Sequence, residues 1–224
     1  MTEFICDIGS NHNANLARAV TLIDTAYKVG ATHVKFQLFD GSIGKTECEW
    51  LPLSFLPILR DEAHAYGLQF GCSPFYLKAV EGLEPYVDFY KLTSNYDMVH
   101  KLFDACLDTG KPIICSFPPY ELKPSDAKYF TRSAHVLAAI PLYPTPLSEV
   151  HLNQIPFNAI VDGWSDHTRN AGVLYRAIHH YNIKVVEFHL DLDGKGWEYH
   201  YGHCWLPDEI KQVIDTVKQG LEVD

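Results

Sequence analysis

Charged and amide side chains interrupt two apolar, strand-like segments of this 224-residue sequence. In a strand, successive side chains point to opposite faces, so residues 34–38 place Lys35 and Gln37 on one face and large apolar groups on the other. Residues 186–190 place Glu187 and His189 in the same way. Lysine and glutamate are rarely buried without partners, and strands that turn such groups inward therefore predict a site.

Strand-like runs alternate with helical patterns along the whole chain. A strand over 4–9 is followed by apolar residues at helical spacing from 16 to 27, and the last helix is predicted over 207–218. Eight such units leave an open doubly wound sheet or a closed barrel, and the count favours a (β/α)8 TIM barrel, one compact α/β domain over 1–224. The predicted strands are 4–9, 33–39, 69–75, 89–94, 112–117, 135–143, 159–165 and 185–190.

The composition limits the partners of the protein. A formal charge of −10 argues against duplex nucleic acid, whose phosphates need a basic surface. Six cysteines without a C-x-x-C pair favour a reducing, cytoplasmic location. The amino terminus resembles no signal segment, and no apolar run reaches the length of a membrane span, so no membrane association is expected.

In a barrel of this kind the site lies at the carboxyl ends of the strands. His167 and His189 come from neighbouring predicted strands and could share one divalent metal ion, with Glu187 on the same face. Two buried histidines bonded to carboxylates are the alternative. The polar residues late in the strands or at their ends are Asp7, Lys35, Gln37, Ser73, Lys91, Ser94, Ser116, Ser165, His167, Glu187 and His189.

Lys35 and Lys91 bring two ammonium groups to this end of the barrel, and nearby serines add neutral donors. Such a set suits a phosphorylated or dicarboxylate-like anion. The alternative is that both lysines form structural ion pairs with Asp7 and Glu187.

The segment 197–205 is rich in aromatic residues and contains the pair His203-Cys204. Adjacent side chains rarely bind the same ion, so we interpret this segment as a cap over the barrel mouth rather than a metal site.

Several motifs resemble the sialic acid synthase family in their order and cover nearly the whole chain. The most specific is Tyr143-Pro144-Thr145-Pro146 followed by Ser165-Asp166-His167-Thr168. The others are Asp7-Ile8-Gly9-Ser10-Asn11-His12-Asn13, Val34-Lys35-Phe36-Gln37, Cys72-Ser73-Pro74-Phe75, Tyr90-Lys91-Leu92-Thr93-Ser94, Gly110-Lys111-Pro112-Ile113-Ile114 and Glu187-Phe188-His189.

The resemblance implies a barrel that binds Mn²⁺ or Mg²⁺ and condenses phosphoenolpyruvate with a sugar-type aldehyde, giving a 3-deoxy-2-ulosonic acid and phosphate. It implies small-molecule substrates and allows a homodimer. His167 and His189 match the metal ligands. Asp7, Lys35, Lys91 and Glu187 are the expected catalytic residues, and the expected substrate-binding residues are Gln37, Ser73, Ser94, Ser116, Tyr143 and Ser165.

Departures from the family pattern concern the acceptor side. Asp7 replaces the usual glutamate, Tyr96 stands where the family has an acidic residue, and the carboxyl-terminal antifreeze-like domain is not in this sequence. These changes predict a different aldehyde and a mouth rebuilt from Tyr96, Tyr143, Phe117 and Trp197. Another reaction of the same metal barrel, such as aldol cleavage, and a non-catalytic binding protein are the alternatives.

Overall fold

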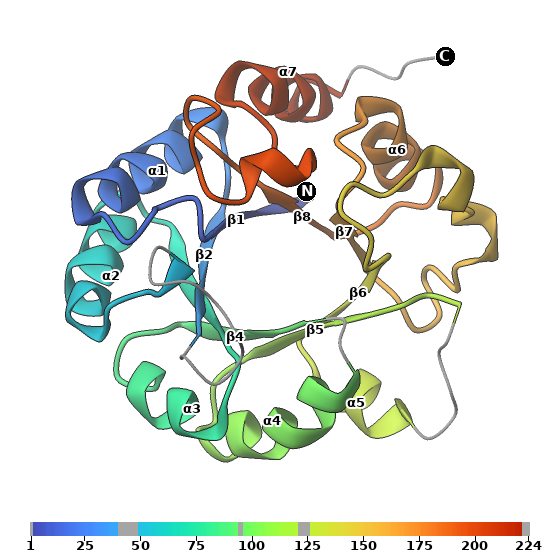
Figure 1. Ribbon diagram of the computed structural model, residues 1–224. Coiled ribbons are helices and arrows are strands. Elements are labelled where there is room, and N and C mark those ends of the chain that lie inside the picture. The colour runs from blue at the N-terminus through green and yellow to red at the C-terminus, as the bar shows by residue number, and fades with distance from the viewer. Residues whose placement is uncertain (1, 40–48, 94–95, 121–125, 221–224) are drawn as a thin grey trace.

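Eight parallel strands close into a barrel in the computed structural model, which describes residues 2–39, 49–93, 96–120 and 126–220. Each strand pairs with the next along the chain, and β8 pairs with β1 (Figure 1). The predicted (β/α)8 architecture is confirmed. The strands are β1 (Glu3–Gly9), β2 (His33–Leu38), β3 (Gln69–Pro74), β4 (Phe89–Leu92), β5 (Ile113–Phe117), β6 (His135–Ala139), β7 (Gly163–Asp166) and β8 (Val185–His189).

Helices surround the barrel on its outside (Figure 1). The first begins where the Asn15 side chain accepts a hydrogen bond from Arg18 N and ends at Gly30, whose φ of 93° suits a residue without Cβ. The helix that follows β8 covers residues 207–218, as predicted. The helices are α1 (Leu16–Val29), α2 (Leu56–Ala65), α3 (Leu77–Leu83), α4 (Tyr96–Asp108), α5 (Ala127–Arg132), α6 (Ala171–Tyr175) and α7 (Pro207–Lys218).

The connection between β6 and β7 differs from the predicted pattern. Strand β6 ends at Ala139 rather than 143, and β7 begins at Gly163 rather than 159. Residues 140–162, all of them described, form two short 3-10 turns but no α-helix. Prolines at 141, 144, 146 and 156 lack the N–H that a strand ladder or helix interior requires.

Among the described residues, no helix is both long and apolar enough to span a membrane.

Apolar side chains fill the lower part of the barrel interior. A cluster of five buried residues comes from β1, β4, β5, β6 and β8, and its members are Ile5, Phe89, Ile114, Leu137 and Val185. Two residues further along each strand, the same inner face carries Asp7, Lys91, Ser116, Ala139 and Glu187. The polar layer therefore rests on an apolar floor and lies toward the carboxyl ends of the strands.

Gly71 leaves room for one side chain of this floor. Gly71 of β3 pairs in register with Phe89 of β4, and a Cβ on Gly71 would lie 2.1 Å from the Phe89 ring. We expect Gly71→Ala to lower the free energy of unfolding by about 2–3 kcal/mol, because a packed aromatic layer cannot yield without strain. The measurement is the midpoint of urea unfolding, compared between proteins whose free energy of unfolding depends on urea concentration with the same slope. The control, Gly82→Ala in α3, meets only ordinary contacts with Leu53 at 3.6 Å and should not destabilise. Equal midpoints in the two variants would contradict the expectation.

Candidate active site

A pocket of about 290 Å³ opens among the last residues of the strands. The structure brings eleven of the twelve predicted site residues to its wall, and Ser94 lies outside the described residues. Their roles remain predictions. The eleven are Asp7, Lys35, Gln37, Ser73, Lys91, Ser116, Tyr143, Ser165, His167, Glu187 and His189.

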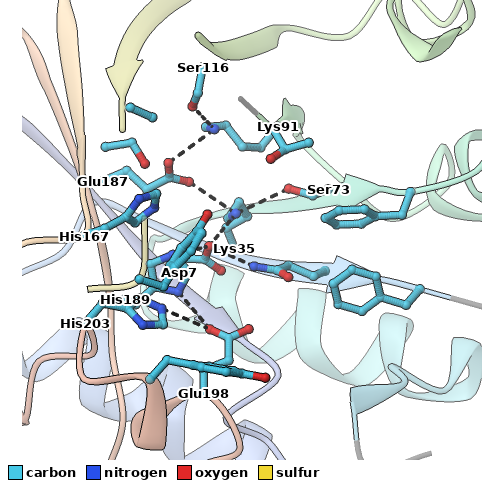
Figure 2. A pocket seen from close by; sticks show the side chains of 18 residues that line it. Asp7, Lys35, Ser73, Lys91, Ser116, His167, Glu187, His189, Glu198 and His203 are labelled. Atoms are coloured by element: carbon cyan, nitrogen blue, oxygen red, sulfur yellow. Dashed lines mark hydrogen bonds and ion pairs between the residues drawn. The ribbon is translucent and has the colours of Figure 1, made fainter. Parts of the chain in front are cut away.

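Glu187 stands between the two lysines of the pocket (Figure 2). Its Oε1 lies 3.2 Å from Lys35 Nζ, and its Oε2 lies 3.2 Å from Lys91 Nζ. Lys35 Nζ also lies 2.6 Å from Asp7 Oδ2. The ion pairs considered as an alternative from the sequence are thus present. Because the same groups line the pocket, they are also available to a ligand that enters it.

Hydroxyl and amide groups complete this polar layer. Lys35 Nζ donates to Ser73 Oγ at 3.3 Å, and Lys91 Nζ donates to Ser116 Oγ. Gln37 Nε2 donates to Asp7 Oδ2 at 3.1 Å. Each ammonium group therefore has a carboxylate and a hydroxyl within reach. These contacts hold the group in one position, and carboxylates do not take up all three of its N–H donors.

Burial and charge shift the ionisation of these groups in different directions. Burial opposes ionisation of Glu187, but the charges of Lys35 and Lys91 outweigh it and hold the pKa of Glu187 below its ordinary value. Burial likewise opposes the charge of Lys35, yet Asp7 and Glu187 raise its pKa. For Lys91 burial prevails over the attraction of Glu187, and its pKa is lowered. Lys91 is therefore the less firmly charged of the two ammonium groups.

His167 and His189 lie side by side in the pocket, with ring centroids 5.4 Å apart. His167 Nδ1 is 2.8 Å from Ile140 O, which can only accept, so Nδ1 carries the proton and Nε2 keeps its lone pair. Burial, together with His189, lowers the pKa of His167 to about 3, which keeps the ring neutral. His189 Nδ1 is bonded to Glu198 Oε2 at 2.8 Å. Histidines oriented in this way by a carbonyl or carboxylate are typical metal ligands.

Glu198 was not among the residues selected from the sequence. It comes from the loop after β8, and its Oε1 accepts a hydrogen bond from Ser10 N at 2.8 Å. Gly9 makes room for it, because a Cβ on that residue would lie 2.3 Å from the carboxylate oxygens. The only sequence signal was an acidic residue within the aromatic segment that we had interpreted as a cap.

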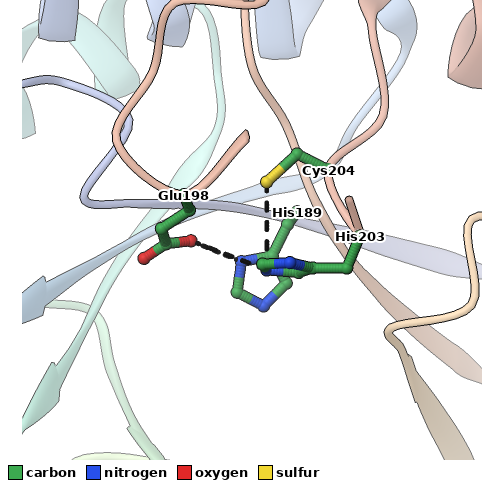
Figure 3. A group of neighbouring side chains, drawn as sticks. All are labelled: His189, Glu198, His203 and Cys204. Atoms are coloured by element: carbon green, nitrogen blue, oxygen red, sulfur yellow. Dashed lines mark hydrogen bonds and ion pairs between the residues drawn. The ribbon is translucent and has the colours of Figure 1, made fainter. Parts of the chain in front are cut away.

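His203 and Cys204 also differ from their interpretation as parts of a cap alone. The His203 ring centroid lies 4.4 Å from that of His189, and Cys204 Sγ lies 3.8 Å from His203 Nε2 (Figure 3). The left-handed Gly202 precedes this pair, and Trp205 N donates to His189 O at 2.8 Å, which fixes the segment beside the end of β8. Contacts between distant segments thus bring His203 and Cys204 beside His189, although their adjacency in the sequence had argued against a shared ion.

The aromatic mouth has a different membership from the one predicted. Tyr143 lines the pocket as expected, with its ring centroid 4.2 Å from His167. Phe117 is buried in the core instead, and Trp197 is not part of the pocket wall. The side chain of Tyr96 lies outside the described residues. The additional aromatic residues of the wall are Phe39, Phe75 and Tyr201.

Comparisons with known proteins agree on one family. A model of the NeuB family matches residues 45–223. An uncharacterized protein of Methanocaldococcus jannaschii is 28% identical over 240 residues, with 97% of this chain and 70% of that protein covered. The spore coat polysaccharide biosynthesis protein SpsE of Bacillus subtilis is 24% identical over 252 residues. That match covers 96% of this chain and 66% of SpsE, so the chain spans about two thirds of the length of these relatives.

Solved structures share the barrel. The N-acetylneuraminic acid synthetase of Leptospira borgpetersenii, in complex with citrate, superposes with a TM-score of 0.85 at 19% identity, covering 97% of this chain and 83% of that chain. SpsE of Bacillus subtilis gives 0.81 at 22% identity, covering 98% and 70%. A truncated 3-deoxy-D-arabino-heptulosonate 7-phosphate synthase of Thermotoga maritima gives 0.70 at 11% identity, covering 97% and 86%. At these identities the likeness establishes the fold.

Proposed function

Because the chain belongs to the NeuB family, we propose that it condenses phosphoenolpyruvate with a sugar-type aldehyde, forming a 3-deoxy-2-ulosonic acid and releasing phosphate. Enzymes of this family are phosphoenolpyruvate-dependent synthases, and they are typically metal-dependent. The condensation forms a carbon–carbon bond between the enol carbon and the aldehyde carbon. Water adds to the carbon that carries the phosphate, and phosphate leaves with the bridging oxygen when the bond between that carbon and the oxygen breaks.

One observation carries the proposal: two buried ammonium groups face a single pocket beside two buried imidazoles. Lys35 and Lys91 are 4% and 2% exposed, so an anion bound between them would be shielded from water. Charge-assisted hydrogen bonds are strong in such surroundings. Ser73 and Ser116 already contact the two lysines and would add hydroxyl donors to the phosphate or carboxylate oxygens.

The residues of the pocket also fit a divalent ion. His167 Nε2 has a free lone pair, and Asp7 Oδ2 lies 3.4 Å from His189 Nε2, a set of nitrogen and oxygen donors that accommodates Mn²⁺ or Mg²⁺ with open positions. Such an ion supplies Lewis acidity toward the aldehyde oxygen. Lys35 and Lys91 would orient the enol phosphate, and Glu187 would keep both ammonium groups on the side of the pocket where the enol phosphate binds.

The acceptor would lie on the aromatic side of the pocket. Tyr143 and Tyr201 are 45% and 43% exposed, and both line the pocket together with Phe39 and Phe75. Flat apolar rings suit the face of a sugar-type aldehyde, whereas Gln37 supplies a polar contact. These features support the prediction of an acceptor other than ordinary N-acetylmannosamine.

The test is phosphate release from phosphoenolpyruvate with Mn²⁺ or Mg²⁺ across a panel of sugar aldehydes that includes N-acetylmannosamine. We expect release only when an aldehyde is present, and most efficiently with one other than N-acetylmannosamine. Efficient turnover of N-acetylmannosamine by this chain alone would refute the altered acceptor. Formation of pyruvate and an aldehyde from a 3-deoxy-2-ulosonic acid, with no phosphoenolpyruvate present, would instead indicate aldol cleavage. No binding of phosphoenolpyruvate and no product would favour a non-catalytic binding protein.

We expect the affinity for phosphoenolpyruvate to decrease at alkaline pH because Lys91 loses its proton. Only the protonated ammonium attracts the anion, and burial lowers the pKa of Lys91 below 10.5, so its charge is lost at lower pH than that of an ordinary lysine. Affinity should therefore decrease as the pH rises through this lowered pKa. Calorimetric titrations across the alkaline range should show the decrease in the wild type, and the variant Lys91→Met should bind weakly without it. If the affinity of both proteins decreased over the same pH range, a group other than Lys91 would be responsible.

A further inference from the structure

Four ligand-type side chains gather where β8 passes into the loop that follows it (Figure 3). We call this group the β8-loop cluster; it consists of His189, Glu198, His203 and Cys204. All four residues are buried, and each offers one ligand atom within 4.8 Å of the others. His167, whose ring centroid lies 5.4 Å from that of His189, is not a member.

The separations of the ligand atoms suit a small cation. Glu198 Oε2 is 2.8 Å from His189 Nδ1 and 3.9 Å from His203 Nε2, and Cys204 Sγ is 3.8 Å from His203 Nε2. In a tetrahedral zinc site, bonds of about 2.0–2.3 Å place neighbouring ligand atoms about 3.3–3.6 Å apart. Because the four atoms lie within 4.8 Å of one another, movements of up to about 1 Å would bring them to one ion.

His203 is poorly satisfied without an ion. It is 2% exposed, and its Nδ1 has no hydrogen-bond partner among the described residues. Its Nε2 is too far from Glu198 for a hydrogen bond and has only a long contact with the Cys204 sulfur. A buried imidazole normally bonds through at least one nitrogen, so its position beside a thiol and a carboxylate indicates a ligand.

Surrounding groups hold the donor atoms in place. Ser10 N donates to Glu198 Oε1 and leaves Oε2 facing His189. Asn11 Nδ2 donates to Cys204 Sγ at 3.4 Å, while Asn11 Oδ1 accepts from Glu198 N at 2.8 Å. The hydrogen bond from Asn11 holds the sulfur in position, and such a second layer of contacts is typical of built metal sites.

We propose that the β8-loop cluster binds a zinc-class divalent ion that fastens the loop over the barrel mouth. A thiolate and two imidazoles select a borderline-soft metal over Mn²⁺ or Mg²⁺. Four protein ligands close the coordination shell, as in structural rather than catalytic zinc sites. The cluster shares three residues with the wall of the pocket of the proposed function, namely His189, Glu198 and His203, and Cys204 is the member outside that wall. His189 presents Nδ1 to the cluster and Nε2 to the pocket.

Cobalt titration of the full, reduced chain tests the cluster, because a thiolate bound to Co²⁺ gives a sulfur-to-metal charge-transfer band in the near ultraviolet. We expect the wild type and His167→Ala to show the band, and Cys204→Ser to lose it. Zinc affinity of Cys204→Ser should decrease by more than about 100-fold, since even outer contacts of a metal site are worth up to that factor. Cys106→Ser, which removes a buried thiol of α4 outside the cluster, is the matched control and should keep both properties.

No band in the wild type, or a band that survives in Cys204→Ser, would overturn the proposal. Loss of the band in His167→Ala would place the ion in the pocket and would also overturn it. Circular dichroism of the metal-free variants reports folding, and if Cys204→Ser does not fold, the bands of the wild type and His167→Ala decide the matter. If the protein released no phosphate, the cobalt band would still be expected. The two experiments therefore test the cluster and the proposed function separately.

Discussion

Replacing Lys35 by methionine should lower phosphate release from phosphoenolpyruvate by about 10²–10³-fold, the loss typical when one donor to a developing anion is removed. Methionine keeps much of the stem volume but not the charge. Lys35 Nζ is the group that joins Asp7 at 2.6 Å to Glu187 at 3.2 Å, so the variant loses a contact to the anion and leaves two carboxylates beside it. The measurements are steady-state phosphate release and calorimetric affinity for phosphoenolpyruvate.

A matched exposed lysine separates this effect from loss of a charge in general. Lys195 lies on the loop after β8 with its side chain 79% exposed, and among the described residues its ion pair is with Asp193, at 3.5 Å. Lys195→Met should keep both the rate and the affinity. If Lys35→Met and Lys91→Met both kept the wild-type affinity for phosphoenolpyruvate, the two lysines would not be the groups that bind this anion.

The buried carboxylates near Lys35 provide a second check. In Lys35→Met, Asp7 loses its ammonium partner at 2.6 Å, and this loss should also lower the stability of the fold, because removing one partner of a buried ion pair is costly. Adding Asp7→Asn should recover part of the urea midpoint but none of the turnover. Recovery of turnover in the double variant would show that Lys35 acts only by neutralising Asp7.

Replacing His167 or His189 by alanine should weaken Mn²⁺ binding in the pocket by more than about 100-fold, because each supplies a primary ligand rather than an outer contact. Phosphate release should decrease with it, since the Lewis acid of the aldehyde would be lost. Metal analysis and calorimetry measure the affinity, and phosphate release measures the rate. His180→Ala, at an exposed position after α6, is the control and should bind as the wild type does.

The two histidine variants also distinguish a metal pair from a structural pair. If the wild type and His189→Ala bind Mn²⁺ equally weakly, the two rings are structural. In that case His189 would serve as the buried partner of Glu198, with which it shares a 2.8 Å hydrogen bond. Loss of stability without loss of metal affinity would be the accompanying result.

Local sequence determined the strands and the face on which each polar group lies. Period-two alternation required that Lys35 and Gln37 leave β2 on the same side, and that Glu187 and His189 leave β8 on the same side. An open doubly wound sheet and a barrel both bury the two faces of parallel strands, and the count of eight strand–helix units favours the barrel, which directs these groups to one mouth. The family motifs lie on those strand ends, so the fold and eleven pocket residues could be predicted together.

Tertiary structure alone decided which charges meet and which loop residues join them. The place of Glu187 between Lys35 and Lys91 depends on closure of the barrel, which no single strand encodes. Glu198 reaches the site through a hydrogen bond with Ser10, 188 residues away in the sequence. A loop without hydrophobic periodicity gives no sign of where its side chains point, because its conformation is fixed by distant contacts rather than by its own repeat.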